Sequence, residues 1–128
     1  MEEKKKIIGF QDLDVYQRAY KAALIINEKI IPFLQKIRQY DLADQIGRSS
    51  RAIPALIAES YAKRHQKKNF KKYLDDGMGE ANETIVHLSF TKDLKYPEPA
   101  LCDELIETYN IIGKQLYNLG NSWLKSKR

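Results

Sequence analysis

Apolar residues recur along most of the chain at intervals of three and four, which is the spacing of one face of an α-helix. The clearest stripe lies near the carboxyl end and consists of Leu101, Leu105, Tyr109, Ile112, Leu116, Leu119 and Trp123. A second stripe has the period of a packed helical seam. Its members are Phe70, Leu74, Gly77, Ala81, Thr84, Leu88 and Thr91.

The stripes and the residues between them predict four helices. The first begins near Asp12 or Asp14, either of which can cap it, and runs to about Ile37. The second spans about 41–64, the third about 66–95 and the fourth about 99–124. Because proline lacks an amide hydrogen, we expect Pro32 to kink the first helix and Pro54 to bend the second.

Short connections between these helices favour antiparallel neighbours. The predicted fold is therefore all-α, an up-down-up-down antiparallel four-helix bundle that forms a single domain over residues 1–128. Residues 1–9 and 125–128 are expected to be flexible basic ends. Apolar or small residues also stand off the seams, which indicates either a wide core or a second buried face and hence a homo-oligomer. These residues are Met78, Ile85, Ile106, Gly113, Tyr117 and Gly120.

Composition narrows the class of protein. Apolar residues make up 43% of the chain and charged residues 30%, a balance that suits a folded domain. The only cysteine, Cys102, cannot pair within the chain, so a disulfide-stapled secreted module is excluded. No apolar run approaches the roughly 20 residues that span a bilayer. We therefore expect a cytoplasmic protein with no membrane partner.

Positive charge is concentrated at one end of the predicted bundle, although the net charge is only +5. The N-terminus, the turn between the second and third helices and the C-terminus all meet at that end. Within these segments only Glu2 and Glu3 oppose the cations, which leaves a local balance of +10. The cations are Lys4, Lys5, Lys6, Lys63, Arg64, Lys67, Lys68, Lys71, Lys72, Lys125, Lys127 and Arg128.

Four of these lysines fall in the opening turns of the third helix, where the helix dipole disfavours positive charge: Lys67, Lys68, Lys71 and Lys72. A phosphate backbone would account for them, because clustered lysine and arginine gain affinity by displacing condensed counterions. A solvated lysine-rich turn that only aids solubility is the open alternative.

Catalytic and metal-binding patterns are missing from the sequence. A di-iron bundle needs Glu-x-x-His on two helices, and the nearest pieces are Glu83 and His87, four residues apart. Cys102 has no base nearby and lies in an acidic segment, so a structural role is expected. There is no glycine-rich phosphate loop or nucleophile elbow. We expect no enzymatic activity, no metal and no cofactor.

Several segments resemble a known family, the four-helix-bundle proteins encoded in intervening sequences of bacterial large-subunit ribosomal RNA genes. They are FQDLDVYQRA at 10–19, LADQIGRSSRAIPALIAES at 42–60, FKKYL at 70–74 and GMGEANE at 77–83. The chain differs at Gly47, Leu56 and Ser60, where that family usually has a basic residue, Asn and Gly. The resemblance implies a homopentamer without enzymatic activity. A related branch comprises the accessory variability proteins of diversity-generating retroelements, which bind a reverse transcriptase and nucleic acid.

The favoured hypothesis is a homo-oligomer that binds structured RNA, or an RNA–DNA hybrid, through phosphates. The expected contacts are made by Lys63, Arg64, Lys67, Lys68, Lys71 and Lys72, extended by Lys125, Lys127 and Arg128, with Arg48 and Arg51 as secondary candidates. Two alternatives stay open. One is an accessory protein that docks a reverse transcriptase and its template in a retroelement, and the other is a pure protein-interaction adaptor.

Overall fold

A computed structural model describes residues 6–126, with side chains to Trp123, and this part of the chain is all-α without strands. The helices are α1 (Asp14–Ile25), α2 (Ile31–Lys36), α3 (Tyr40–Ala62), α4 (Lys67–Asp93) and α5 (Pro99–Ser126). A 3₁₀ turn (Phe10–Asp12) precedes α1, and a π-helical turn (Ile26–Ile30) joins α1 to α2. The chain thus has the four predicted helical segments, with α1 and α2 forming the first.

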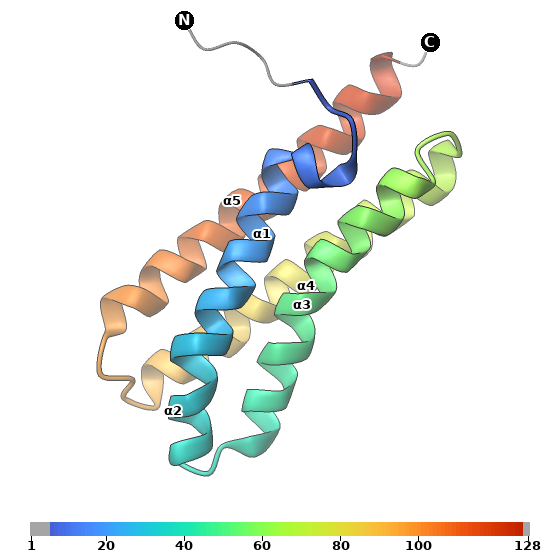
Figure 1. Cartoon of the computed structure of the whole chain (residues 1–128). Helices are drawn as coiled ribbons and strands as arrows, with labels where there is room; N and C mark the ends of the chain where they lie inside the picture. The colour runs from blue at the N-terminus through green and yellow to red at the C-terminus, as the bar shows by residue number, and fades with distance from the viewer. Residues whose placement is uncertain (1–5, 127–128) are drawn as a thin grey trace, which may run out of the picture.

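Each long helix packs against two others. α1 contacts α3 and α5, and α4 contacts the same two helices. Figure 1 shows that the loop between α3 and α4 lies at the same end of the molecule as the start of α1 and the end of α5. The other two loops lie at the opposite end (Figure 1). Within the described residues, this arrangement places the start of α1, the loop between α3 and α4 and the end of α5 at one end, where the sequence analysis expected the basic segments.

The first helical segment differs in detail from its prediction. Leu13 is the N-cap of α1 and no side chain caps the helix, so the expected cap by Asp12 or Asp14 is wrong. The Asp12 carboxylate instead accepts hydrogen bonds from the amides of Ile8 and Gly9, at 2.8 and 3.1 Å. Asp14 is the first residue of α1.

A π-helical turn lies directly before Pro32. Proline donates no hydrogen bond, and its ring clashes with the carbonyl four residues earlier in a regular α-helix. The wider turn removes this conflict, because the amide of Ile31 bonds to the carbonyl of Ile26. Ile26 and Ile30 stay fully buried across the irregular turn. Pro54, by contrast, lies buried inside α3, which continues to Ala62.

The core confirms the two predicted seams. All seven members of the α4 seam are buried, and they are the only buried residues of that helix. In α5 the four central seam positions are buried, while Leu101, Leu119 and Trp123 pack against the core from its edge. Two buried hydroxyls also meet across α3 and α4, where Ser49 and Thr84 share a hydrogen bond of 2.8 Å. Their pairing removes the cost of burying them alone.

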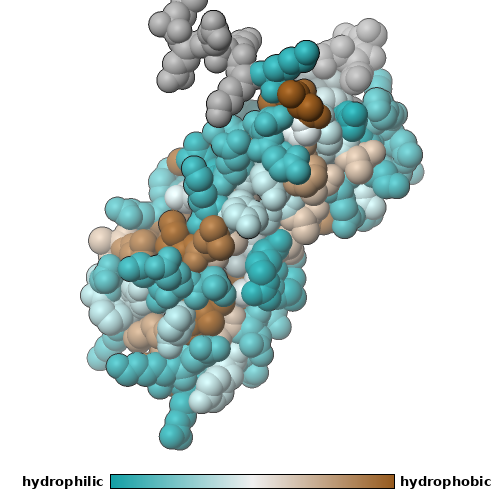
Figure 2. All heavy atoms as spheres, in the orientation of Figure 1, coloured by the Kyte–Doolittle hydropathy of each residue, from teal (hydrophilic) through white to brown (hydrophobic). Residues whose placement is uncertain are grey.

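Most of the apolar residues off the seams broaden this core. Met78, Ile85 and Ile106 are half-buried against it, whereas Tyr117 is 59% exposed. Other large apolar side chains are also exposed, among them Tyr20, Leu24, Val86 and Phe90. Figure 2 shows hydrophobic side chains in separate patches on the mostly hydrophilic face that carries α1 and α3. Within residues 6–126, no helix has the length and hydropathy needed to cross a bilayer.

Candidate nucleic-acid interface

The loop between α3 and α4 is a tight turn held by backbone hydrogen bonds. The amide of Lys63 bonds to the carbonyls of Glu59 and Ser60, and the amide of Gln66 bonds to the carbonyl of Lys63 at 2.8 Å. The amide of Phe70 then bonds to the carbonyl of Gln66 at 2.9 Å, which closes the first turn of α4. The exposed side chains of Lys63, Lys67 and Lys68 have no ion-pair partner in the described chain.

Arg64 is held in place by an aromatic cluster. Its guanidinium carbon lies 4.3 Å from the centre of the Tyr61 ring, and its Nη1 donates to the Tyr61 carbonyl at 2.9 Å. The Tyr61 ring contacts Trp123, and Trp123 contacts Phe70, with ring centres 6.3 and 5.7 Å apart. A guanidinium has five N–H donors, so a fixed Arg64 can still bind a phosphate with the donors left over.

Two of the predicted cations are paired with acids. Lys71 lies 3.4 Å from Asp75, and Lys72 lies 3.1 Å from Asp76, each across one turn of α4. The hydrogen bond that Lys72 donates to the Asp76 carboxylate is the main cause that raises the pKa of Lys72. The balance of +10 counted from the sequence is therefore too high, because it left out these two aspartates one turn further along. Exposed pairs of this kind contribute little stability, so a phosphate can compete for both lysines.

The start of α4 combines two lysines with free backbone amides. Its first turn holds Lys67 and Lys68, contains no acidic residue, and has no side-chain cap. The first amides of any α-helix lack partners within the helix. Amides and lysines that point outward from one helix start create a local positive potential that favours an anion.

The structure separates Arg48 and Arg51 from this end. Arg48 lies in the middle of α3 and bridges to α4, where it pairs with Glu80 at 2.8 Å and also with Glu83. Its Nε donates to Gln45 at 3.2 Å. Arg51 is exposed and lines a hollow between α1 and α3. Arg48 therefore bridges two helices, and its guanidinium is paired with two carboxylates.

Three other predicted residues fall at the end of the chain. Lys125 is part of α5, but its side chain is outside the described residues, and Lys127 and Arg128 are outside them altogether. Lys4 and Lys5 are likewise outside, while Lys6 is exposed. Within the described residues, the candidate site consists of Lys63, Arg64, Lys67, Lys68, Lys71 and Lys72.

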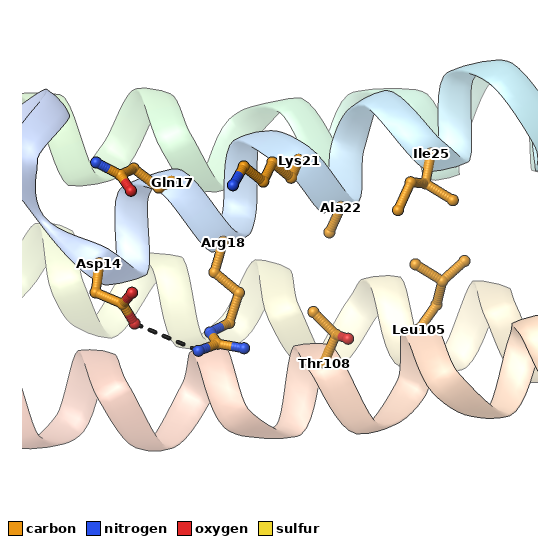
Figure 3. A pocket seen from close by; sticks show the side chains of 8 residues that line it. All are labelled: Asp14, Gln17, Arg18, Lys21, Ala22, Ile25, Leu105 and Thr108. Atoms are coloured by element: carbon orange, nitrogen blue, oxygen red, sulfur yellow. Dashed lines mark hydrogen bonds and ion pairs between the residues drawn. The ribbon is translucent and has the colours of Figure 1, made fainter.

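Two cations near the start of α1 were missed by the sequence analysis. Arg18 and Lys21 line a hollow of about 300 Å³ between α1 and α5 (Figure 3). Arg18 pairs with Asp14 at 3.4 Å and donates from Nε to Gln115 at 3.2 Å. The Gln115 hydrogen bond, followed by Arg18, lowers the pKa of Asp14. Arg18 and Lys21 stand three residues apart on one predicted helix, and this spacing could have indicated that they share a surface. The sequence analysis counted charge only at the two chain ends and in the loop between the second and third helices, so it did not include them.

The two groups considered for chemistry, His87 and Cys102, are partly or fully buried. His87 Nε2 lies 3.7 Å from Glu83, and burial, followed by the charge of Arg48, lowers the pKa of His87. Burial likewise raises the pKa of Cys102, which lies fully inside the core. In the described chain, no three His, Cys, Asp or Glu side chains come close enough together to hold a metal.

Fold and site together define a small all-α protein with a basic end formed by one helix start and the loop before it. The model of one family, the 23S rRNA-intervening sequence protein, matches residues 11–118. The chain belongs to this family. Comparisons with curated proteins and with solved structures give no match.

Proposed function

We propose that this protein is a non-enzymatic, cytoplasmic, oligomeric RNA-binding protein. It binds structured RNA, or an RNA–DNA hybrid, mainly through phosphates at the basic end. The observation that carries the proposal is the first turn of α4, where Lys67 and Lys68 are exposed beside uncapped amides and no acid is present.

That arrangement is costly for the isolated protein. Each cation at a helix N-terminus is unfavourable by about 0.3–1 kcal/mol, and an acidic residue there would stabilise the helix. A bound phosphate reverses the sign, because it accepts hydrogen bonds from the helix amides and pairs with the lysines. The residue types at this position fit a polyanionic partner better than they fit an unoccupied helix start.

The other residues of the basic end have complementary roles in the proposal. Lys63 and Arg64 extend the positive surface onto the loop, and the fixed guanidinium of Arg64 suits bidentate phosphate binding. Lys71 and Lys72 exchange their aspartate partners for phosphates. The binding is directed at backbone and shape, which is how double-stranded RNA is mostly recognised.

Self-association is part of the same proposal, as a homopentamer of up-down-up-down antiparallel bundles. Support comes from two unpartnered apolar surfaces on different helices. One is lined by Tyr20 and Leu24 with Pro54 between α1 and α3, and the other is formed by Val86 and Phe90 on α4. Two different surfaces that bind each other form a ring when the rotation closes. A ring would repeat the basic end several times and raise its avidity for RNA.

Charge reversal at the two unpaired lysines tests the proposal. Lys67→Glu with Lys68→Glu is cleaner than reversal at Lys71 and Lys72, because those changes would also place like charges beside Asp75 and Asp76. Binding to a labelled RNA hairpin is measured by fluorescence anisotropy across a salt series. We expect at least tenfold weaker binding, and a slope of log affinity against log salt that is smaller by about 1 for each lysine changed.

The matched control is Lys29→Glu with Lys36→Glu, two exposed lysines of the first helical segment. Each change removes two units of charge, so both double variants have the same net charge. A phosphate site at the basic end predicts that the control loses much less affinity than the test variant. Equal losses would mean that only net charge matters, and absence of binding by the wild type at low salt would overturn the proposal.

A second candidate function is favoured by the hollow between α1 and α3. Its volume is about 510 Å³ and its lining includes Tyr16, Tyr20, Leu24 and Pro54. An apolar hollow of this kind suits a protein partner. In that function the protein is an adaptor, for example one that docks a reverse transcriptase in a retroelement, and reversal of Lys67 and Lys68 leaves partner binding unchanged.

A further inference from the structure

A groove between α4 and α5 carries polar groups that neither the core nor the basic end uses. Its volume is about 510 Å³, and its lining includes Asn82, Asn110, Gly113, Lys114, Tyr117 and Asn118. The three asparagines and Lys114 are exposed, and their side chains have no hydrogen-bond or ion-pair partner within the described part of the chain. The groove therefore offers free donors and acceptors beside a Tyr117 ring that is 59% exposed.

Gly113 at the edge of this groove has no explanation in the packing of the helices. Glycine inside a helix lowers its stability relative to alanine. Glycine is usually retained where a neighbouring atom leaves no room for a side chain, as at Gly77, where an added Cβ would lie 3.1 Å from Leu116. At Gly113 an added Cβ would meet nothing within 4 Å. The open space at this position belongs to the groove and is accessible to a ligand.

The groove is continuous with the basic end. A neighbouring hollow is lined by Lys71 and Asn121 and shares Met78 and Tyr117 with the groove. The line from Lys71 to Asn82 covers 11 residues of α4, or about 16 Å at the helical rise per residue. A strand whose phosphates leave the basic end at Lys71 therefore reaches Tyr117 and Asn118 first, and Asn82 and Asn110 next.

We propose that this groove binds unpaired nucleotides of the RNA held at the basic end. Tyr117 stacks on a base, the amides of Asn82, Asn110 and Asn118 bind base edges, and Lys114 contacts a phosphate. Amides present the donor and acceptor pairs that match base edges, and an exposed aromatic ring is the usual platform for an unpaired base. This inference rests on the proposed RNA binding, and it specifies that the groove between α4 and α5 binds the unpaired part of the RNA.

The chemistry of the groove distinguishes an RNA from a second copy of the chain. An apolar helix face laid over the groove would leave three amides and a lysine buried without partners, which is unfavourable. Four exposed apolar side chains that suit such a contact do not line this groove: Val86 and Phe90 on α4, and Tyr20 and Leu24 on α1. Among the exposed large apolar side chains of the described residues, Tyr117 is the one that does.

Two RNA probes test the inference. One is a blunt hairpin, and the other is the same hairpin with a short single-stranded extension of adenosines. Anisotropy titrations compare the wild type with Tyr117→Leu. We expect Tyr117→Leu to bind the extended hairpin about fivefold or more weakly and to bind the blunt hairpin within twofold of the wild type. The control is Tyr40→Leu, because Tyr40 is 57% exposed and begins α3 at the opposite end of the molecule.

A second variant and a crosslinking experiment test the groove without relying on the Tyr117 side chain alone. Gly113→Leu fits without a clash at its Cβ and fills the groove, so it should fold and lose the same preference for the extended probe. When a 4-thiouridine replaces one adenosine of the extension, the RNA should crosslink to the tryptic peptide Gln115–Lys125, which contains Tyr117 and Asn118. Circular dichroism and light scattering confirm that each variant keeps its helicity and mass.

The possible results separate this inference from the proposed function. If the wild type binds both probes equally, or the crosslink maps to residues that do not line the groove, the groove is not an RNA site although the basic end still is. If Tyr117→Leu alters the mass of the assembly and leaves both affinities unchanged, the groove is a contact between copies. If the wild type binds neither probe, both proposals fail.

Discussion

Tyr109 allows a stability prediction that runs against the usual effect of a core mutation. Its ring is fully buried in α5, and its hydroxyl is buried without a hydrogen-bond partner among the described residues. Tyr109→Phe removes the hydroxyl and keeps the ring, so packing is conserved. The change therefore isolates the free energy of burying one unpaired polar group.

The magnitude follows from that group alone. A buried donor or acceptor without a partner costs about 1–3 kcal/mol. We expect Tyr109→Phe to raise the free energy of unfolding at neutral pH by about 1 kcal/mol or more. For a chain of this length the melting temperature should increase by roughly 3–5 °C.

The pH dependence provides an independent check. Burial raises the pKa of Tyr109 well above its ordinary value of 10.0. In the unfolded chain this tyrosine loses its proton near pH 10, while in the folded protein it stays protonated, so deprotonation favours unfolding. The wild type should lose up to about 1.4 kcal/mol per pH unit above pH 10 from this residue, and the phenylalanine variant should not.

Urea unfolding followed by circular dichroism measures both effects, at pH 7 and at pH 10.5 and at one fixed protein concentration. Tyr40→Phe is the control, because Tyr40 is 57% exposed and its stability change should be close to zero. The reasoning is refuted if Tyr109→Phe is less stable than the wild type at pH 7, since the hydroxyl must then have a partner. An unchanged difference between the two pH values would refute the titration argument.

Two further predictions concern the helix surfaces. Arg48→Gln removes the ion pairs with Glu80 and Glu83. We expect it to lower the free energy of unfolding by up to about 1 kcal/mol and to leave RNA affinity within twofold of the wild type. It should also raise the pKa of His87, because a nearby positive charge is lost. NMR titration of His87 and the hairpin assay check this, and a large loss of RNA affinity would return Arg48 to the binding site. Phe90→Asp places a charge on an exposed apolar face of α4 and should reduce the mass measured by light scattering from 74.5 kDa, that of five 14.9-kDa chains, to that of one chain. An unchanged mass would remove this face from the contact between copies.

The helices were predictable because their signal is local and repeated. The seam of α4 is defined by seven positions together, so a wrong assignment at one residue does not change which face of the helix is predicted to be buried. All seven positions are buried in the structure. The caps and the irregular turn before Pro32 were not predictable in the same way. A cap depends on one side chain, and the Asp12 carboxylate turned to the amides of Ile8 and Gly9.

The basic end was predictable in its members but not in its charge. Composition and topology together indicated Lys63, Lys67 and Lys68. The pairs of Lys71 and Lys72 with aspartates one turn away were visible as a spacing of four residues, but the count stopped at residue 72. Arg48 could not be assigned from the sequence, because its partners Glu80 and Glu83 stand on another helix, more than 30 positions along the chain.

The sequence by itself determined the class of fold, the helices with their buried faces and the segments that carry positive charge. These properties depend on periodicity and composition, which act through neighbours within one or two helical turns. Only the tertiary structure decided which charges are free and where polar groups meet across helices. Asn82 stands on α4 and Asn110 on α5, and they line one groove because the two helices pack against each other. Side-chain pairing across helices depends on their rotation and relative height, and local periodicity does not specify either.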